Sequence, residues 1–389
     1  MSPVTLPERG FPTSEYRQRM ARAQTMMKAA GLSALLLTTE PEVRYFTGYL
    51  TRFWESPTRP WFLIVPASGN PVAVIPSIGA ALMGKTWITD IRTWSAPDLV
   101  DDGVSLLADT LLEICGDGGL IGVPSGHETH VRMPYDDITR LKGLVSKNDI
   151  TDDAGIMRAL RMVKSELEIA KIRHACHIAG RAFARVGEIA GAGDPLDQVF
   201  RRFQGLCLEE GADWVPYLAG GAGPDGYADV ISPATPDPML PGDILMLDTG
   251  LVWDGYFCDF DRNFAIGPPS DAAKTAQARL MEAVQAGADA ARPGARASDI
   301  FHAMDKIVTG GAGGSEAGRL GHGLGMQLTE WPSFIAGDDT ILEEGMVLTL
   351  EPGIDVSPGR ILVHEEDIVI TAGAPEFLSP RASPDLPIL

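Results

Sequence analysis

The chain has 389 residues, enough for two domains of ordinary size. Its content of 45% hydrophobic and 22% charged residues is typical of a globular protein and excludes a disordered one. The net charge of −20 would repel nucleic acids and anionic membrane surfaces, so neither is an expected partner.

The sequence also lacks the usual signs of membrane insertion or export. No stretch approaches ~18 consecutive apolar residues, and residues 1–20 contain no apolar segment like that of a signal peptide. The four cysteines are scattered without CxxC spacing, as expected for reduced thiols. These features predict a cytoplasmic protein.

Helical and strand-like patterns alternate in the first part of the chain. Residues 13–31 have an apolar face at helical spacing, and a second helix is predicted at 104–115. This alternation predicts an α/β N-terminal domain, residues 1–155. The apolar runs bounded by turn residues predict strands at 33–39, 61–66, 71–76 and 120–123.

The remaining chain, residues 156–389, predicts a second domain in a protein of the α+β class. Helices are expected within 152–189 and at 195–210, 270–291 and 298–308. Antiparallel strands are expected at 244–247, 253–257, 263–266, 347–350, 361–364 and 367–371.

Four carboxylates and one imidazole in this domain form a candidate metal-ligand set: Asp248, Asp259, His322, Glu351 and Glu365. Asp248 ends an apolar strand, and a hairpin can bring Asp259 opposite it, where two carboxylates repel unless cations lie between them. The glycines around His322 allow close backbone approach and aim the imidazole. Oxygen donors with one nitrogen suit two divalent ions of Mn, Fe, Co or Zn.

The motifs around these residues resemble those of the pita-bread metallopeptidases, which include methionine aminopeptidase, aminopeptidase P, prolidase and the metal-free creatinase. The motifs are DTG at 248–250, GYFCDFDR at 255–262, GHGLG at 321–325, EPG at 351–353 and EED at 365–367. VRYFTGY at 43–49 and KSELEIAKIR at 164–173 resemble the prolidase and creatinase branch. The resemblance implies a creatinase-like α/β N-terminal domain followed by a pita-bread catalytic domain.

The resemblance also implies a role for each ligand. Asp248 would chelate one metal, Asp259 and Glu365 would bridge both, and His322 and Glu351 would bind the second. Glu351 would serve as general base, so that Glu351 and His322 are the expected catalytic residues. A homodimer acting on a dipeptide or small molecule is implied as well.

The chain departs from the peptidase pattern at two histidines that bind the substrate carbonyl and handle protons in the family. The segment 227–235 contains no histidine, and Thr329 stands where the second is expected. Val363 and His364 also occupy the place of an arginine that often precedes the last glutamate ligand. We therefore expect an atypical member of this family, which keeps all five metal-ligand residues but lacks the two histidines.

Several residues are candidates to contact the substrate. Thr329 and Trp331 lie in the LTEWP segment, and Tyr256 lies beside the predicted hairpin. Arg52 and Trp54 belong to a segment that reaches the partner's active site in prolidase-like dimers. For each aromatic residue, core packing is an equal alternative.

Three functions are consistent with the sequence. The first is a dinuclear metal-dependent hydrolase that cleaves an amide-like C–N bond. The second is a metal-dependent lyase of the type that cleaves dimethylsulfoniopropionate, which the missing histidines favour. The third is a non-catalytic binding module on the same fold.

Overall fold

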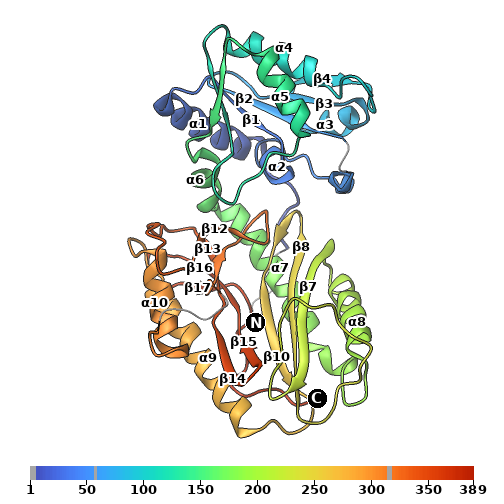
Figure 1. The fold of residues 1–389 in the computed structure, drawn as a ribbon, viewed down its shortest axis with the longest axis vertical. Coiled ribbons are helices and arrows are strands. Elements are labelled where there is room, and N and C mark those ends of the chain that lie inside the picture. Colours follow the sequence, from blue (N-terminus) through green and yellow to red (C-terminus); the bar gives the residue numbers. More distant parts are fainter. Residues whose placement is uncertain (1–5, 57–58, 313–317) are drawn as a thin grey trace. The chain divides into compact units, whose positions relative to one another are not determined.

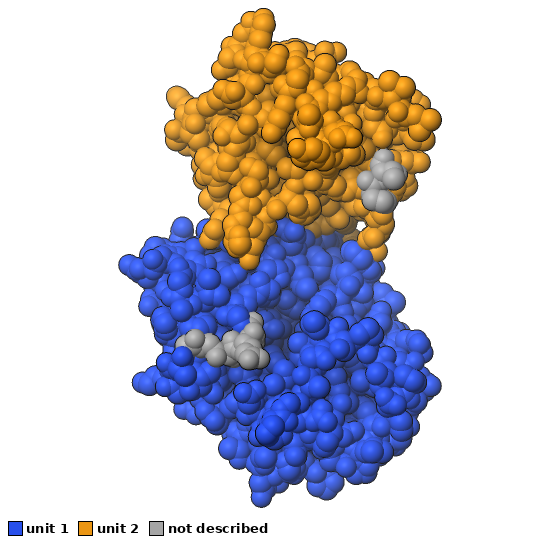
Figure 2. All heavy atoms as spheres, in the orientation of Figure 1, with its two compact units in different colours: residues 1–7, 162–389 blue, residues 8–161 orange. Residues whose placement is uncertain are grey.

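The computed structural model of the chain describes residues 6–56, 59–312 and 318–389. They form two compact units, one of residues 8–161 and one of residues 162–389, to which residues 6 and 7 also belong (Figure 2). The sequence places the boundary at 155/156, before helix α6 (Ile156–Met162), whereas the units divide at the end of that helix. No helix in the described ranges is long and apolar enough to cross a membrane.

The unit of residues 8–161 is a six-stranded sheet with helices, in the strand order β4-β3-β2-β1-β5-β6 (Figure 1). β1, β2 and β3 are buried along their whole length, as their continuous apolar runs predict. The strands are β1 (Ala34–Leu37), β2 (Phe62–Pro66), β3 (Val72–Pro76), β4 (Asp90–Trp94), β5 (Leu120–Val123) and β6 (Asp149–Asp152). The helices are α1 (Thr13–Ala30), α2 (Glu40–Thr47), α3 (Ala80–Met83), α4 (Val104–Cys115) and α5 (Tyr135–Leu144), with short 3-10 turns at Arg52–Glu55 and Ser77–Gly79.

The predicted helices of this unit are confirmed. α1 ends where Gly31 adopts φ 72° and its backbone N–H bonds to carbonyls of the last turn, a cap that glycine adopts without strain. α4 covers the predicted residues 104–115. Two elements were not predicted from the sequence: α2, which a capping box at Thr39 initiates, and the half-exposed edge strand β4.

The second unit contains two main sheets. One has the order β10-β8-β7, with the short β9 beside β8, and the other has the order β12-β11-β13-β16-β17. The strands of the first are β7 (Trp214–Pro224), β8 (Asp243–Trp253), β9 (Tyr256–Phe257) and β10 (Phe260–Ala265). Those of the second are β11 (His322–Gly323), β12 (Glu330–Ser333), β13 (Val347–Leu350), β16 (Glu366–Val369) and β17 (Glu376–Phe377), and β14 (Gly353–Ser357) pairs with β15 (Arg360–Val363).

Helices cover these sheets on the outside (Figure 1). α7 packs against β8 and α8 against β7, whereas α9 packs against β13, β14 and β15 and also against α10. Leu280, Val284 and Met304 from α9 and α10 join Leu348 and Leu350 of β13 in one buried core. The helices are α7 (Glu166–Ala184), α8 (Leu196–Glu209), α9 (Asp271–Ala290) and α10 (Ala297–Val308), with a 3-10 turn at Val186–Glu188.

Two predicted elements of this unit are wrong in detail. The helical stretch 152–189 is broken between α6 and α7, where Ser165 caps α7 through a capping box with Glu168. The predicted strand 253–257 is interrupted by a tight turn, since Asp254 and Gly255 both have positive φ. The chain therefore reverses between β8 and β9 instead of continuing as one strand.

Candidate metal centre

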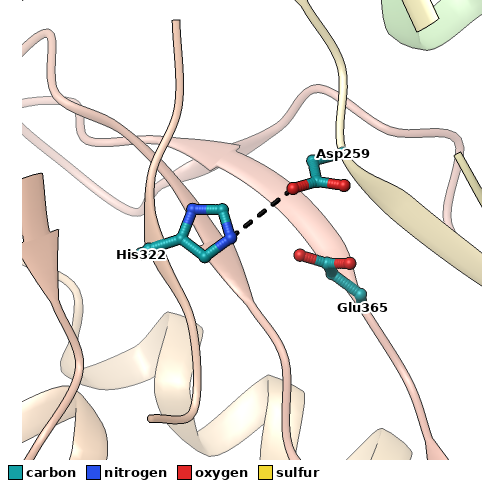
Figure 3. Close-up of side chains that lie close together, drawn as sticks. All are labelled: Asp259, His322 and Glu365. Atoms are coloured by element: carbon teal, nitrogen blue, oxygen red, sulfur yellow. Dashed lines mark ion pairs between the residues drawn. The ribbon is translucent and has the colours of Figure 1, made fainter. Parts of the chain in front are cut away.

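Three predicted ligands converge in the second unit. Asp259, His322 and Glu365 each offer one ligand atom, and these atoms all lie within 4.8 Å of one another (Figure 3). Asp259 directly precedes β10, His322 begins β11, and Glu365 directly precedes β16. All three side chains are at least 95% buried, so the cluster belongs to the interior and is not a solvated acidic patch.

His322 presents one free ring nitrogen to this cluster. Its Nδ1 lies 2.8 Å from the carbonyl oxygen of Gly323, which can only accept, so Nδ1 carries the proton. Nε2 then has a lone pair and faces Asp259 Oδ2 at 3.5 Å. Burial and, secondarily, the charge of Arg319 lower the pKa of His322 to about 4, which keeps the ring neutral. A neutral imidazole with Nε2 free is the form that binds a metal.

The carboxylates of the centre are short of hydrogen-bond donors. Asp248 Oδ1, Asp259 Oδ1 and Glu365 Oε1 are buried and accept no hydrogen bond within the described chain. Burial and then neighbouring carboxylates raise the pKa of all three residues well above the usual values. Buried charges require a partner, and a divalent cation would satisfy these oxygens together with His322 Nε2. The residues present therefore fit a metal.

Asp248 and Glu351 lie outside the 4.8 Å group but act on it electrostatically. Their negative charges both contribute to the raised pKa of Asp259 and of Glu365. Burial raises the pKa of Glu351 to about 7. The side chain of Tyr217 on β7, a residue that sequence reasoning missed, opposes the rise in the pKa of Asp248.

The predicted hairpin is confirmed, but its register is different. β8 and β10 pair so that Asp248 lies opposite Asp261, two residues beyond Asp259. Asp261 Oδ1 accepts hydrogen bonds from the backbone N–H of Glu365 at 3.0 Å and from Nδ1 of His364 at 3.2 Å. Asp261 thus positions a predicted ligand, and only the strand register could have revealed it.

A buried ion network supports the end of β15 and the start of β16. Burial opposes a charge on His364, but Asp261 and Glu366 on either side of the ring outweigh it and raise the pKa of His364. Arg262 Nη2 donates to Glu366 at 2.9 Å. His364 and Glu365 connect the two strands, so this network holds the segment that carries a predicted ligand.

A buried ion pair holds the segment that carries His322. Lys164 Nζ lies 3.1 Å from Glu330 Oε2, and both side chains are at most 2% exposed. Glu330 Oε1 also accepts from the backbone N–H groups of Met326 and Gln327. One carboxylate therefore fixes the loop between β11 and β12.

The glycines beside His322 serve strand packing. A Cβ added to Gly323 would lie 1.9 Å from the carbonyl oxygen of Trp331, and one added to Gly321 would lie 2.3 Å from that of Thr349. Both obstacles are backbone atoms that cannot move aside. The glycines thus let neighbouring strands approach closely, and this packing orients the imidazole of His322. The glycines need no ligand contact of their own for this effect.

The residues predicted to contact substrate lie in different environments. Tyr256 is 1% exposed and its hydroxyl donates to Glu168 of α7 at 2.9 Å, which is the core-packing alternative. Thr329 is half-buried and accepts from Arg319, and Trp331 is buried on β12. Arg52 and Trp54 lie in the other unit, where Arg52 pairs with Glu55.

In the segment 227–235, where peptidases of the family carry a histidine, the chain has a buried tyrosine followed by a turn. Tyr227 is buried, and its hydroxyl accepts from the backbone N–H of Val363 at 2.6 Å. Asp229 accepts from Ile231 and Ser232 and closes a turn. Ile231 is 85% exposed. This part of the segment therefore contains no imidazole that could move protons near neutral pH.

Comparison with known families assigns both halves of the chain. Residues 170–372 match the model of metallopeptidase family M24, and residues 19–163 match the creatinase/prolidase N-terminal domain. The chain therefore belongs to metallopeptidase family M24 and is a metal-dependent hydrolase with a creatinase-type N-terminal domain.

Relatives and solved structures match this chain over nearly its full length. The chain is 30% identical to the probable dipeptidase PepE of Mycobacterium tuberculosis over 93% of each chain, and 26% identical to the Xaa-Pro dipeptidase of Lactobacillus delbrueckii subsp. lactis over 89% of this chain and 92% of that one. The crystal structure of dipeptidase PepE from Mycobacterium ulcerans matches with a TM-score of 0.83 at 28% identity, covering 97% of this chain and 99% of the other. A prolidase from Thermococcus sibiricus matches in fold with a TM-score of 0.85 at 24% identity, covering 96% and 99%.

Replacing Glu330 by glutamine is predicted to destabilise the second unit. The glutamine can still accept the loop N–H groups, but Lys164 would be left buried without a counter-charge. Breaking one side of a buried pair costs roughly 3–5 kcal/mol in the free energy of unfolding. Chemical denaturation measures the loss, with Arg201→Gln as control because its ion pair with Asp197 is on the surface. A loss no larger than that of the control would contradict the role of Glu330.

The metal-free chain is predicted to lose stability as the pH rises. Burial raises the pKa of Glu351 to about 7 and that of Asp367 to about 8, whereas both lie near ~4 in an unfolded chain. The folded state then binds more protons than the unfolded state between about pH 4 and about pH 8, so its stability falls across this window. Thermal denaturation at about pH 5 and about pH 8 measures the effect, which Mn²⁺ should reduce because bound metal needs ionised ligands. A metal-free midpoint that rises with pH would contradict the account.

Proposed function

We propose that the chain is a dinuclear metal-dependent hydrolase that cleaves an amide-like C–N bond of a dipeptide or small molecule. The observation that carries the proposal is the buried group of Asp259, His322 and Glu365 with its unpartnered ligand atoms. The PepE and Xaa-Pro dipeptidase relatives support a short peptide as substrate. Mn, Fe, Co and Zn all suit these donors.

Each predicted ligand would have a distinct task. Asp248 would hold one ion, Asp259 and Glu365 would lie between both, and His322 and Glu351 would complete the second position. Two such ions supply Lewis-acid activation of water and of the scissile carbonyl. The backbone of Glu365 and the imidazole of His322 are already positioned by Asp261 and by the Gly323 carbonyl.

Proton transfer falls to Glu351 in this proposal. A general base must be ionised to accept a proton, and bound cations would keep Glu351 ionised although burial raises its pKa to about 7 in the metal-free chain. His322 is unsuited to the task because its Nδ1–H is bound to a carbonyl and its pKa lies at about 4. One carboxylate would therefore accept the proton of the attacking water and return it to the leaving amine.

The same proposal covers the cellular location, the partners, the oligomeric state, the substrate contacts and the domain limits. The net charge of −20 supports a cytoplasmic protein without nucleic-acid or membrane partners. The resemblance to prolidases supports a homodimer, and Arg52 and Trp54 stay predicted substrate contacts, as does Trp331. We also propose residues 1–155 and 156–389 as the domain limits.

A metal-dependent lyase is the second candidate function. Thr329 is the observation that favours it, since a threonine hydroxyl cannot replace a histidine in moving protons near neutral pH. A lyase would release an alkene from a substrate such as dimethylsulfoniopropionate instead of adding water to a carbonyl. Release of dimethyl sulfide by the Fe- or Mn-loaded chain, without cleavage of any dipeptide, would favour this alternative.

Metal analysis with a substrate screen tests the proposal. Protein purified without chelator should contain two divalent ions per chain and should hydrolyse members of a panel of Xaa-Pro dipeptides and cyclic amidines. Asp259→Asn removes a ligand charge and should lower kcat/KM at least about 100-fold, because changes to groups that only support metal ligands already cost about 10- to 100-fold. Asp385→Asn, at an exposed aspartate of the same unit, should change neither metal content nor rate. Wild-type protein without bound metal, or an Asp259→Asn variant with full activity, would refute the assignment.

A further inference from the structure

The second unit contains a cavity of about 410 Å³, which is lined by residues of α7, β10, α9 and the segment 380–389. We call it the α7–α9 cavity. None of the five predicted metal ligands lines it, so it is separate from the candidate metal centre. Pockets that take small molecules typically measure about 300–1,000 Å³, and one water molecule occupies only about 30 Å³. The α7–α9 cavity is therefore large enough for a compact organic ligand.

Buried aromatic and amide side chains line the α7–α9 cavity. Phe183 of α7 and Phe264 of β10 are at most 7% exposed and give it apolar walls. Gln277 of α9 is 3% exposed, and its Oε1 is buried without a hydrogen-bond partner in the described chain. Leaving a buried amide unpaired costs about 1–3 kcal/mol, which a hydrogen-bonding ligand would offset. The amide can turn about its last side-chain bond, so its oxygen or its nitrogen can face such a ligand.

Hydrogen bonds hold the wall formed by residues 380–382 in place. Arg262 lines the cavity and donates to the carboxylate of Glu366 at 2.9 Å and to the carbonyl of Pro380. Glu366 Oε1 also accepts from the backbone N–H of Ala382 at 2.9 Å. Gly180 lets α7 approach this wall, because a Cβ there would lie 2.5 Å from Cγ of Pro380. The cavity is thus preformed, which lowers the cost of ordering it around a ligand.

The mouth of the α7–α9 cavity carries a positive charge. Arg381 lines the cavity and is exposed, its Cζ lies 3.9 Å from the centroid of the Phe377 ring, and its Nη1 donates to Gln285 at 3.3 Å. Within the described parts of the chain, no carboxylate oxygen lies within the 4.0 Å of an ion pair from this guanidinium. A guanidinium has five N–H donors in a fork that matches a carboxylate. An anionic group at the mouth would find such donors available.

We propose that the α7–α9 cavity is a second ligand site, which binds a small carboxylic acid with an apolar body and a hydroxyl group at its far end. The apolar body lies against Phe183 and Phe264. The hydroxyl bonds to the amide of Gln277, and the carboxylate pairs with Arg381 at the mouth. The site does not depend on the hydrolase function proposed above, because no predicted metal ligand takes part in it.

Three related probes test the parts of this site by calorimetry on the Mn-loaded full-length chain. 4-Hydroxyphenylacetate has all three features, phenylacetate lacks the hydroxyl, and 4-hydroxyphenylacetamide lacks the charge. The wild type should bind 4-hydroxyphenylacetate most tightly. Phenylacetate should bind about 2- to 10-fold more weakly, the net value of one hydrogen bond. The amide should bind up to about 5-fold more weakly, the value of an exposed ion pair.

Two variants remove one polar contact each. Gln277→Met keeps the length of the side chain and should abolish the preference for 4-hydroxyphenylacetate over phenylacetate. It should not lower the free energy of unfolding, because it removes an unpaired buried amide. Arg381→Gln should abolish the preference for the acid over the amide. Gln198→Met and Arg201→Gln, at exposed positions of α8, are the matched controls and should bind all probes as the wild type does.

A third variant reduces the space in the α7–α9 cavity. Gly187 lines the cavity, and a Cβ there would meet only Leu389, another lining residue, at the ordinary contact distance of 3.8 Å. The backbone at Gly187 thus accepts a side chain. Gly187→Phe places a ring in the cavity and should weaken the binding of all three probes at least about 10-fold, because it takes the volume that their rings need.

The outcomes distinguish this inference from the proposed function. Asp259→Asn should bind all three probes as the wild type does, because the α7–α9 cavity is separate from the metal centre. Binding that is lost in Asp259→Asn but kept in Gln277→Met and Gly187→Phe would place the probes at the metal centre and overturn the inference. A wild type that binds none of the probes would overturn it as well, as would preferences that persist in Gln277→Met and Arg381→Gln. The hydrolase would stand in each of these cases, since its own test is metal content and turnover.

Discussion

The structure of the second unit depends on the repulsion among carboxylates that have been removed from water. Asp248, Asp259 and Glu365 are all at most 4% exposed, and the pKa of each is raised well above its usual value by burial and then by neighbouring carboxylates. Burying such groups together does not stabilise a fold, because removing each charged carboxylate from water costs several kcal/mol. Divalent cations remove the repulsion, so the cluster makes physical sense as a metal centre.

The scaffold around this centre works to keep the acids in place when no cation neutralises them. Asp261 accepts the N–H of Glu365, the carbonyl of Gly323 orients His322, and Glu330 fixes the loop that follows His322. Each support comes from a different strand or loop of the unit. Preorganisation of this kind allows ligands to meet a metal without first rearranging the backbone, which is the condition for rapid chemistry at a metal site.

The sequence singled out three side chains that the structure brings together, Asp259, His322 and Glu365, but it did not predict their surroundings. Glycine and proline residues flank His322 and Glu351, and such signals are local. Asp261 was missed because its importance arises from strand register and from a contact across the sheets, which no local pattern encodes. Local patterns of helices and strands also predicted the α+β class and most of the elements. The turn after β8 and the break before α7 were not predicted, because both depend on backbone geometry.

The central claim is that two divalent ions share Asp259 and Glu365. Crystals of the Mn-loaded chain, measured on both sides of the manganese absorption edge, test it most directly. The account predicts two anomalous peaks about 3.5–4 Å apart, each within bonding distance of both carboxylates, with His322 Nε2 on one of them. A single peak, or peaks that do not contact Asp259 and Glu365, would contradict it.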